Sequence, residues 1–443
     1  MTNFVPSLTE PRAARKLRSA EAVLDNGLRV IAVRKPGIPL VELRLRVPFL
    51  SAKAEHPARA MLLAEALLTG AAGYDRAGLA AAIQALGGDL HAGVDADRLV
   101  IGGNVLATNL RKLLDVLAAV VTEPAYAAGE VGTERDRLVE RLTIMRARPS
   151  VVAAEALSHR MWGDHPYAVD LARPADVSGV SPAQLRSLHR SLVRPGGAAL
   201  VLVGDLAPGR MIDAAAKALG GWTGAAARTK VPELPAPPGG PLQLVHRPGS
   251  VQSSFRLGGP ALPRTDADYP ALQLANLIFG GYFTSRWTEN LREDKGYTYG
   301  PHSRVDHHVL GSVLTLSVEV AGKDTAPAHL ETLYELGRLA TLPVSEQEVA
   351  SVKQYAIGTL ALSTATQAGL ASTLSALSAF GLGLDWITGH PDRLLATTVE
   401  QVSAAAARFF APAAFTSVVV GDADAVAGPL AALVPVERQP AEQ

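Results

Sequence analysis

Residues 180–205 read VSPAQLRSLHRSLVRPGGAALVLVGD, and residues 397–422 read TTVEQVSAAAARFFAPAAFTSVVVGD. Each stretch predicts a helix, a proline that ends it, a buried strand and a Gly-Asp turn. Pro195 and Pro412 are 217 positions apart, and Gly204 and Gly421 keep the same offset (421 − 204 = 217). A register kept in this way indicates that the second half of the chain repeats the first.

The repeat extends beyond these stretches. Pro174 and Pro391 also differ by 217 positions, while Glu130 and Glu348 differ by 218, so one single-residue insertion or deletion separates the two regions. Between the halves lies a proline-rich segment, residues 225–241 (AAARTKVPELPAPPGGP), whose composition favours a semi-rigid extended spacer. We therefore predict a first domain over 1–224, a linker over 225–241 and a second domain over 242–443.

Hydrophobic periodicity alternates within each half. Residues 40–47 (LVELRLRV) predict a strand with apolar side chains on one face and Glu42, Arg44 and Arg46 on the other. The remaining predicted elements are strands at 28–33, 98–102, 252–257 and 312–320 and helices at 57–68, 77–86, 110–121, 270–279 and 326–339. Strands and helices mix without regular βαβ alternation, so we expect an α+β protein made of two homologous domains.

Composition narrows the function classes. The chain of 443 residues has 42 basic and 42 acidic residues and a formal net charge of zero, which argues against nucleic-acid or anionic-membrane partners. Cysteine is absent, which excludes disulfides, thiol catalysis and cysteine-based metal sites. Residues 1–24 contain no apolar core of signal-peptide length, and no apolar run long enough to cross a membrane follows, so we expect a cytoplasmic protein.

The second half contains GGYFTSRWTENLREDKGYTYG over residues 280–300. This segment resembles the "G-x-x-x-S-R-L…L-R-E-x-x-G-L-x-Y" segment of pitrilysin/insulinase peptidases, which include the mitochondrial processing peptidase and small bacterial relatives. Residues 25–30 (DNGLRV) resemble the first strand of that family, and residues 164–167 (DHPY) resemble its "HPYG" turn. With the duplication, the resemblance spans nearly the whole chain and implies one half of a clam-shell peptidase.

Active members of that family carry a zinc motif, H-x-x-E-H, on the first helix, with a further Glu about 75 residues later. Aligned on Leu67, Leu68 and Gly70, the three motif positions fall on Met61, Ala64 and Glu65, and the downstream ligand position falls on Arg141. A guanidinium in a ligand position would repel zinc. The resemblance therefore implies that this chain holds no catalytic zinc.

A different metal site stays open as an alternative. Glu140 precedes Arg141, and Glu134 matches the first of two acidic positions in the family. Glu65, Glu134 and Glu140 could together hold a metal, although three carboxylates without histidine suit magnesium or calcium better than zinc.

The resemblance carries two further residues over to this chain, Arg292 and Tyr299, which have the family's spacing of seven (299 − 292 = 7). In the family, these residues bind substrate opposite the zinc. A phenolic O–H at Tyr299 would stabilise charge on the scissile carbonyl oxygen. The guanidinium of Arg292 would hold main-chain carbonyls of an extended peptide. Tyr297 is expected to be a packing residue, and residues 293–295 a solvated helix end.

A chain with the substrate residues and without the metal ligands resembles one subunit of a two-chain family member. The expected partner is a homologous subunit that carries the zinc, and the expected substrate is a peptide. The alternative is a non-enzymatic structural or peptide-binding homologue. Residues 89–97 (DLHAGVDAD) are the candidate sheet edge for peptide addition, with His91 as a possible contact. The pair His307 and His308 is expected on a solvated strand, with the two side chains on opposite faces.

Overall fold

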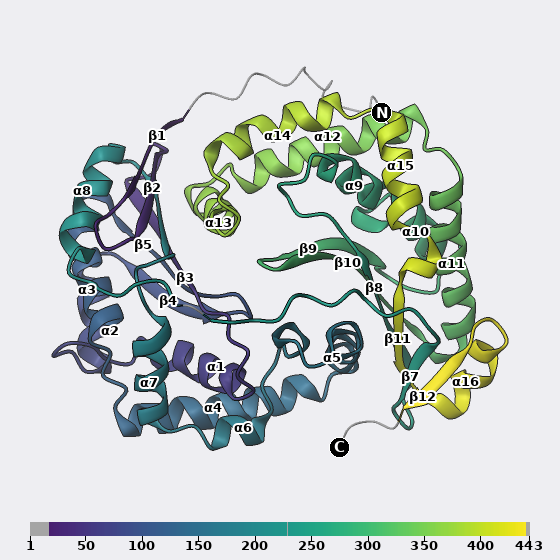
Figure 1. Cartoon of the computed structure of the whole chain (residues 1–443), viewed down its shortest axis with the longest axis horizontal. Coiled ribbons are helices and arrows are strands. Elements are labelled where there is room, and N and C mark those ends of the chain that lie inside the picture. Colours follow the sequence, from purple (N-terminus) through teal and green to yellow (C-terminus); the bar gives the residue numbers. More distant parts are fainter. Residues whose placement is uncertain (1–16, 228, 440–443) are drawn as a thin grey trace, which may run out of the picture.

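The computed structural model describes residues 17–227 and 229–439 and contains two six-stranded mixed sheets (Figure 1). The first sheet has the order β1-β2-β6-β3-β5-β4, and the second has the order β12-β7-β11-β8-β10-β9. The strands of the first sheet are β1 (Arg18–Val23), β2 (Arg29–Arg34), β3 (Leu40–Pro48), β4 (Asp89–Val94), β5 (Arg98–Leu106) and β6 (Ala199–Gly204). Those of the second are β7 (Leu242–His246), β8 (Gln252–Pro260), β9 (His302–His308), β10 (Gly311–Ala321), β11 (Thr416–Gly421) and β12 (Val436–Gln439).

Helices surround each sheet, which confirms the predicted α+β class. The first domain has α1 (His56–Ala66), α2 (Arg76–Ala85), α3 (Leu110–Thr122), α4 (Ala128–Arg146), α5 (Pro149–Trp162), α6 (Pro174–Ser178), α7 (Pro182–Leu192) and α8 (Pro208–Leu219), with short turns η1 (Ala107–Asn109) and η2 (Pro166–Ala168). The second has α9 (Tyr269–Asn276), α10 (Arg286–Thr288), α11 (Thr325–Thr341), α12 (Glu346–Ser363), α13 (Gln367–Ser378), α14 (Leu384–Ala396), α15 (Val399–Phe409) and α16 (Ala423–Ala431), with η3 (Leu277–Gly281), η4 (Glu289–Asp294), η5 (Gly322–Asp324) and η6 (Pro412–Ala414).

The duplication is visible in the topology. Strands β2, β6, β3, β5 and β4 occupy the same order in the first sheet as β7, β11, β8, β10 and β9 in the second. The outermost strand differs, because β1 pairs antiparallel with β2, whereas β12 pairs parallel with β7. Five strands of each sheet therefore belong to the repeat, and the sixth comes from a different end of the chain.

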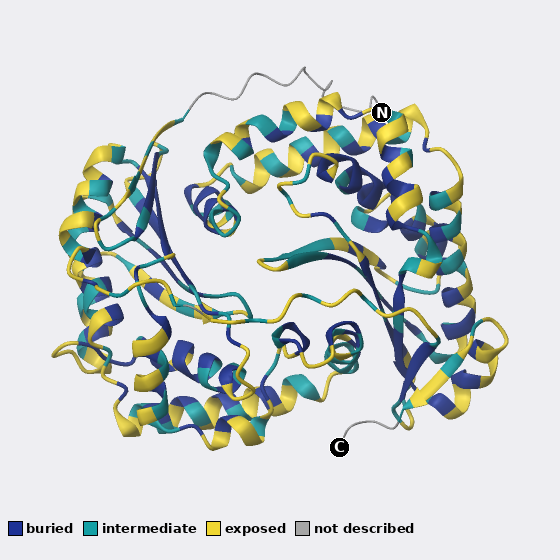
Figure 2. Ribbon diagram, in the orientation of Figure 1, coloured by how far each residue is buried: buried dark blue, intermediate teal, exposed yellow. Residues whose placement is uncertain are grey.

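Alternation along β3 sorts its side chains onto two faces. Val41, Leu43, Leu45 and Val47 are fully buried in the core between the first sheet and its helices. Glu42, Arg44 and Arg46 lie at the intervening positions, as predicted. Their face does not open directly to bulk solvent, because α13 of the second domain contacts both β3 and β6. The central strands of both sheets are accordingly coloured as buried in Figure 2.

The two domains exchange helices across their interface. Helix α13 packs Leu370 and Leu374 against apolar side chains of β2 and β6 in the first sheet. Helix α5 of the first domain packs in the same way on β8 and β11 of the second sheet, with Met161 close to Gly258. A Cβ at Gly258 would lie 2.0 Å from the Met161 sulfur, so glycine allows this close approach. Each sheet thus completes its core with a helix from the other half (Figure 1).

The linker runs along this interface. Residues 225–241, apart from position 228, which lies outside the described residues, form no helix or strand. His165 accepts a hydrogen bond from the Tyr167 backbone N–H at Nδ1, so Nε2 is free to donate to the Pro232 carbonyl at 3.2 Å. Arg160 donates to the Pro241 carbonyl at 2.5 Å. The "HPY" turn and α5 therefore hold the segment in place, while its bounds as a linker stay a prediction.

One expectation about the second sheet holds only in part. His307 and His308 do point to opposite sides of β9, but both are half-buried rather than solvated. His307 contacts the Ser312 hydroxyl at 2.8 Å, and burial lowers its pKa to about 3. The ring of His308 packs 4.5 Å from that of Tyr167 in the first domain. Contacts from α5, η2 and α9, which alternation along one strand cannot reveal, shield both imidazoles in part.

Within the described ranges, no helix is long and apolar enough to cross a membrane. The prediction about a missing signal-peptide core concerns residues 1–24, of which 1–16 lie outside the described part of the chain.

Candidate functional site

The helix that matches the zinc motif is α1, and it presents the three motif positions differently. Met61 is half-buried, Ala64 is buried in the first core, and Glu65 is exposed. The Met61 sulfur accepts a weak hydrogen bond from the Ala172 backbone N–H at 3.5 Å. A thioether and a methyl group replace a ligand and a general base, so these two positions offer nothing that would hold or activate zinc.

The downstream position lies beside this helix. Arg141 on α4 donates from Nη2 to Glu65 Oε1 at 2.5 Å, and the two side chains are 48% and 36% exposed. The sequence alignment thus brings together residues that are neighbours in the fold. The carboxylate that remains is neutralised by a fixed cation, which is unfavourable for a divalent metal. The residues present do not fit the family's zinc.

The carboxylate alternative is not assembled either. Glu65 pairs with Arg141, while buried Glu134 accepts hydrogen bonds from Arg76 at 2.6 Å and Arg137 at 3.0 Å. Glu140 is exposed on α4. The three carboxylates therefore do not converge on one point.

Another group has the spacing of a metal site among the described residues: His246, Asp422 and Asp424. Its ligand atoms are already engaged. His246 Nδ1 accepts a hydrogen bond from the Ala423 backbone N–H at 3.0 Å, and the Asp422 carboxylate accepts from the backbone N–H groups of Gly249 and Asp424. This group is a helix cap for α16.

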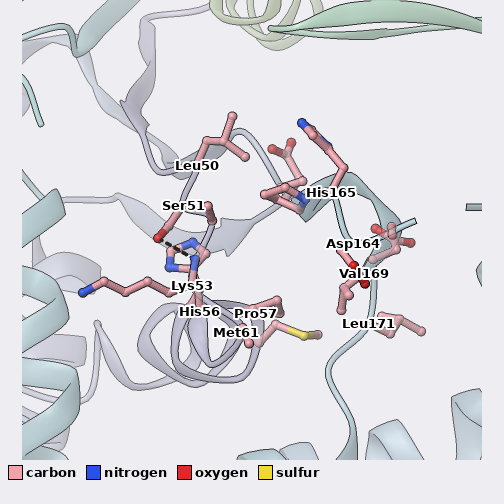
Figure 3. Close-up of a pocket in the computed structure, with 18 of the residues that line it drawn as sticks. Leu50, Ser51, Lys53, His56, Pro57, Met61, Asp164, His165, Val169 and Leu171 are labelled. Carbon is pink, nitrogen blue, oxygen red and sulfur yellow. Dashed lines mark hydrogen bonds between the residues drawn. The ribbon is translucent and has the colours of Figure 1, made fainter. Parts of the chain in front are cut away.

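A cavity of about 570 Å³ lies beside the first zinc-motif position. Met61, His56 and Pro57 come from α1, while Leu50 and Ser51 come from the segment after β3 (Figure 3). The opposite wall comes from the segment after α5, at residues 163–171. Burial lowers the pKa of His56 to about 4, so this imidazole is neutral at pH 7.

Strand β4 is the edge of the first sheet, as predicted for residues 89–97. Val94 at the end of β4 and Asp95 just after it also line the cavity beside Met61. His91 is 62% exposed, contacts the Asp89 carboxylate at 3.5 Å, and lies over Gly102 of β5. The position of His91 on an exposed edge is compatible with a peptide contact, which stays a prediction.

The segment that carries Arg292 is built on two π-helical turns, η3 and η4, which flank α10. Turns of this kind are rare and are frequently found at functional sites. Arg286 anchors the segment through Glu348 on α12, with its Nε and Nη2 donating at 2.7 and 2.9 Å. Burial alone would raise the pKa of Glu348, but hydrogen bonds from Arg286 and Ser345 outweigh it and lower the pKa to about 2. Trp287 is fully buried and donates from its indole N–H to Thr332 Oγ1 at 3.0 Å.

Arg292 lies between two aromatic rings on this anchored segment. Its guanidinium carbon is 4.2 Å from the Phe283 ring centroid and 4.8 Å from that of Tyr299. Its Nε is 3.2 Å from Glu293 Oε1, and its side chain is 23% exposed. Phe283 is 62% exposed and Tyr299 is 85% exposed, so the stack stands at the surface. Cation–π contacts of this kind hold a guanidinium plane while leaving its edge free to donate.

The surrounding residues follow the sequence prediction. Tyr297 packs against the second core, while Glu293, Asp294 and Lys295 are exposed. Phe283 was not among the predicted site residues, because a single aromatic in a turn has no spacing signal.

Each candidate pair of residues forms within a single domain. Glu65 meets Arg141 in the first domain, and Arg292 meets Tyr299 in the second. No contact between these two pairs occurs among the described residues, and α1 and α10 lie in different domains (Figure 1).

A duplicated α+β chain with an altered metal helix and an exposed Arg-Tyr pair has the architecture of a peptidase. Residues 50–175 match the family model described as "Insulinase (Peptidase family M16)", and residues 179–355 match "Peptidase M16 inactive domain". The chain belongs to the M16 (insulinase) peptidase family.

Relatives in this family differ in what their names say. An uncharacterized zinc protease of Mycobacterium leprae is 25% identical over 312 residues, which are 67% of this chain and 68% of that protein. The probable inactive metalloprotease YmfF of Bacillus subtilis is 25% identical over 259 residues, which are 55% of this chain and 58% of that protein.

Solved structures support the fold. A peptidase M16 inactive domain from Pseudomonas fluorescens superimposes with a TM-score of 0.84 at 24% identity and covers 91% of this chain and 98% of that one. A protease from Helicobacter pylori superimposes with a TM-score of 0.80 at 16% identity and covers 91% and 99%. At these identities, the likeness concerns the fold alone.

Proposed function

We propose that this chain is the catalytically incomplete subunit of a two-chain zinc endopeptidase that acts on peptides. In this proposal, a homologous partner subunit holds the zinc, and this chain supplies Arg292 and Tyr299. The observation that carries the proposal is the exposed stack of Phe283, Arg292 and Tyr299 on a segment that contains the π-helical turn η4. An exposed stack of this kind contributes little to stability, and its free N–H and O–H groups are well suited to contact a substrate.

The two residues would have different roles. Thr298 Oγ1 donates to the Glu319 carbonyl at 2.7 Å and so ties the residue before Tyr299 to β10. The Tyr299 hydroxyl, on an 85% exposed side chain, can then donate to the carbonyl oxygen of a bound peptide as charge develops on it. A well-placed donor of this kind lowers the barrier by about 3 to 4 kcal/mol. Arg292 would hold neighbouring main-chain carbonyls in register.

The first domain supports the division of labour. The ion pair between Glu65 and Arg141 occupies two positions that align with zinc ligands of active relatives. Met61 and Ala64, at the other two motif positions, have no group that could bind zinc or activate water. The partner would supply the hydrolytic metal, so neither chain alone would be expected to have full activity.

Reconstitution tests the proposal. The purified chain should contain no stoichiometric zinc by metal analysis and should cleave no peptide. Adding a homologous subunit with an intact H-x-x-E-H motif from the same host should restore cleavage. Tyr299→Phe should then lower kcat by about 100-fold or more, because the donor to the carbonyl oxygen is lost.

Tyr297→Phe is the matched control, since Tyr297 packs against the core and its ring would stay in place. It should change kcat by less than about threefold. Equal rates for the wild-type and Tyr299→Phe complexes would remove Tyr299 from the mechanism.

A non-enzymatic peptide-binding role is the second candidate, favoured by a relative named a probable inactive metalloprotease. A neighbouring gene for a similar chain with H-x-x-E-H would favour the peptidase. Failure of every such partner to form a complex with the chain would favour the second role.

A further inference from the structure

A cavity of about 720 Å³ lies between the two domains and is called the central cavity below. Its walls come from β3, the β4–β5 turn and α5 of the first domain and from β8, β9 and α13 of the second. It is therefore formed by the same interface at which the two domains exchange helices. A volume of this size is typical of sites for small organic ligands.

Arg46 on β3 lines this cavity and has no partner for its charge. The residue is 5% exposed, and its Nε is buried without a hydrogen bond. Among the described residues, no carboxylate lies within ion-pair distance of its guanidinium. Arg44, on the same face of β3, shows the contrast, because it donates to Glu42 at 3.0 Å and to Ser372 of α13 at 3.2 Å.

The nearest carboxylates are engaged elsewhere. Asp95 accepts from Arg98 Nε at 2.8 Å and from two backbone N–H groups. Asp97 accepts from the Tyr167 hydroxyl at 2.5 Å and from the Val309 backbone N–H at 3.1 Å. Both carboxylates act on Arg46 from a distance, but burial has the larger effect, and the pKa of Arg46 is lowered.

Other charged groups in the wall are also accounted for. Arg256 is bound to Glu319 at 2.8 Å, and Arg304 is bound to Asp306 at 2.8 Å. Among the described residues, Arg264 contacts the Tyr269 hydroxyl and aromatic rings but no carboxylate. Asp170 also lines the cavity and forms no ion pair with a described residue. The lining contains five arginines and five acidic residues, so the burial of Arg46 without a partner, rather than a net charge, distinguishes this cavity.

A buried guanidinium without a partner is unfavourable, and removal of such a charge usually stabilises a fold. Its fork of N–H groups matches a carboxylate. Trp162, Tyr167 and Phe380 provide aromatic walls close to it. These features fit an anion with two coplanar oxygens attached to an apolar body.

We infer that the central cavity binds a carboxylate ligand with an apolar or aromatic body, with Arg46 as the anchor for the carboxylate. The chemistry fits the free carboxyl terminus of a short peptide and equally a small aromatic acid. This site is separate from Arg292 and Tyr299, neither of which lines the central cavity. Its test needs neither the partner subunit nor peptide cleavage, so it stands or falls independently of the proposed function.

Calorimetric titration of the purified chain with three probes tests the inference. The probes are the tripeptide Ala-Ala-Phe as the free acid, the same tripeptide as the C-terminal amide, and 3-phenylpropionate. The acid forms should bind, and the amide should bind at least about 30-fold more weakly because it cannot pair with the guanidinium. Tighter binding of the tripeptide acid would identify a peptide terminus, and tighter binding of 3-phenylpropionate would identify a small acid.

Two variants locate the site. Arg46→Met keeps the length of the side chain and removes its charge, so it should lose binding of the acids by at least about 30-fold while its melting temperature stays the same or rises. Arg304→Gln is the matched control, because Arg304 lies in the same wall but is 65% exposed and paired with Asp306. It should bind within about threefold of wild type.

The inference fails if the wild-type chain binds neither acid at millimolar concentration, or if the acid and amide bind equally well. Retained acid binding in folded Arg46→Met would also overturn it. The comparison of acid with amide uses the unaltered chain, so it decides the question even if a variant does not fold.

Discussion

Glu65 and Arg141 illustrate how one residue pair can take the place of a metal centre. In the family pattern, both positions belong to zinc ligands, a histidine and a glutamate. Here an acidic and a basic side chain meet at 2.5 Å, so the local charge is balanced without a metal. The pair is about half-exposed, and solvent screens such interactions strongly.

This screening gives a prediction about the free energy of unfolding. Arg141→Met should lower it by at most about 1 kcal/mol, because an exposed ion pair contributes little. Arg286→Met is the comparison, since Arg286 is 11% exposed and binds both oxygens of Glu348. Its loss should cost about 2 to 3 kcal/mol. Urea unfolding of the two variants measures both, and a larger effect for Arg141→Met would contradict the assignment of a weak pair.

Sequence alone selected some of these residues and missed others for physical reasons. The alignment selected Glu65 and Arg141 as positions of one site, but not the ion pair between them, because they lie on two different helices, α1 and α4. Arg46 was placed on the polar face of its strand, but alternation does not say what covers that face. Helix α13, more than 300 residues later in the chain, buries it. Phe283 was missed because its role arises only from stacking on Arg292.

At the scale of elements, α11 carries a buried titratable group. His329 is 2% exposed, stacks on Phe255, and has no hydrogen-bond partner at Nδ1. Burial lowers its pKa to about 4, whereas the unfolded value is about 6.5. The unfolded chain therefore binds the proton first as the pH falls, so stability is lost between pH 6.5 and 4.

Replacing this histidine should flatten the pH dependence. His329 costs the wild-type chain about 2 kcal/mol of stability between pH 7.5 and pH 5. Between the same two pH values, the free energy of unfolding of His329→Leu should therefore fall by about 2 kcal/mol less than that of wild type, as measured by urea unfolding. Equal slopes for wild type and His329→Leu would show that His329 is not protonated on unfolding in this range.

The elements themselves were largely predictable. Predicted strands at 40–47 and 252–257 correspond to β3 and β8, and the helix at 110–121 corresponds to α3. The two π-helical turns were not foreseen, and the helix predicted over 270–279 continues into η3. Hydrophobic periodicity reports which residues are apolar, whereas a π turn depends on how Trp287 and its neighbours fit the second core.

For the whole molecule, the sequence predicted the duplication but not the exchange of α5 and α13. A helix with an apolar face needs a sheet to cover, and both sheets of a duplicated chain offer similar surfaces. The choice of the opposite sheet depends on the path of the linker and on positions such as Gly258, where Met161 packs. Such long-range pairing leaves no periodic signal in either half.

At the interface between the two domains, the side chain of Tyr167 links its own segment with two turns. The Tyr167 hydroxyl donates to Asp97 Oδ1 at 2.5 Å and accepts from the Leu310 backbone N–H at 3.2 Å. Burial raises the pKa of Tyr167, so the hydroxyl stays protonated and remains able to donate. It therefore connects the β4–β5 turn of the first domain with the β9–β10 turn of the second.

Tyr167→Phe should loosen this connection without disturbing either domain core. The ring would keep its contact with His308, but the Asp97 carboxylate, at 11% exposed, and the Leu310 N–H would lose a partner. That loss should cost about 1 to 3 kcal/mol. Tyr126→Phe is the matched control, because the Tyr126 hydroxyl contacts His189 at 2.9 Å within the first domain. By hydrogen exchange, Tyr167→Phe should speed exchange in residues 306–310 and spare α7, whereas Tyr126→Phe should do the reverse. If both variants gave the same exchange pattern, the domains would be held together by apolar packing of α5 and α13 rather than by this hydroxyl.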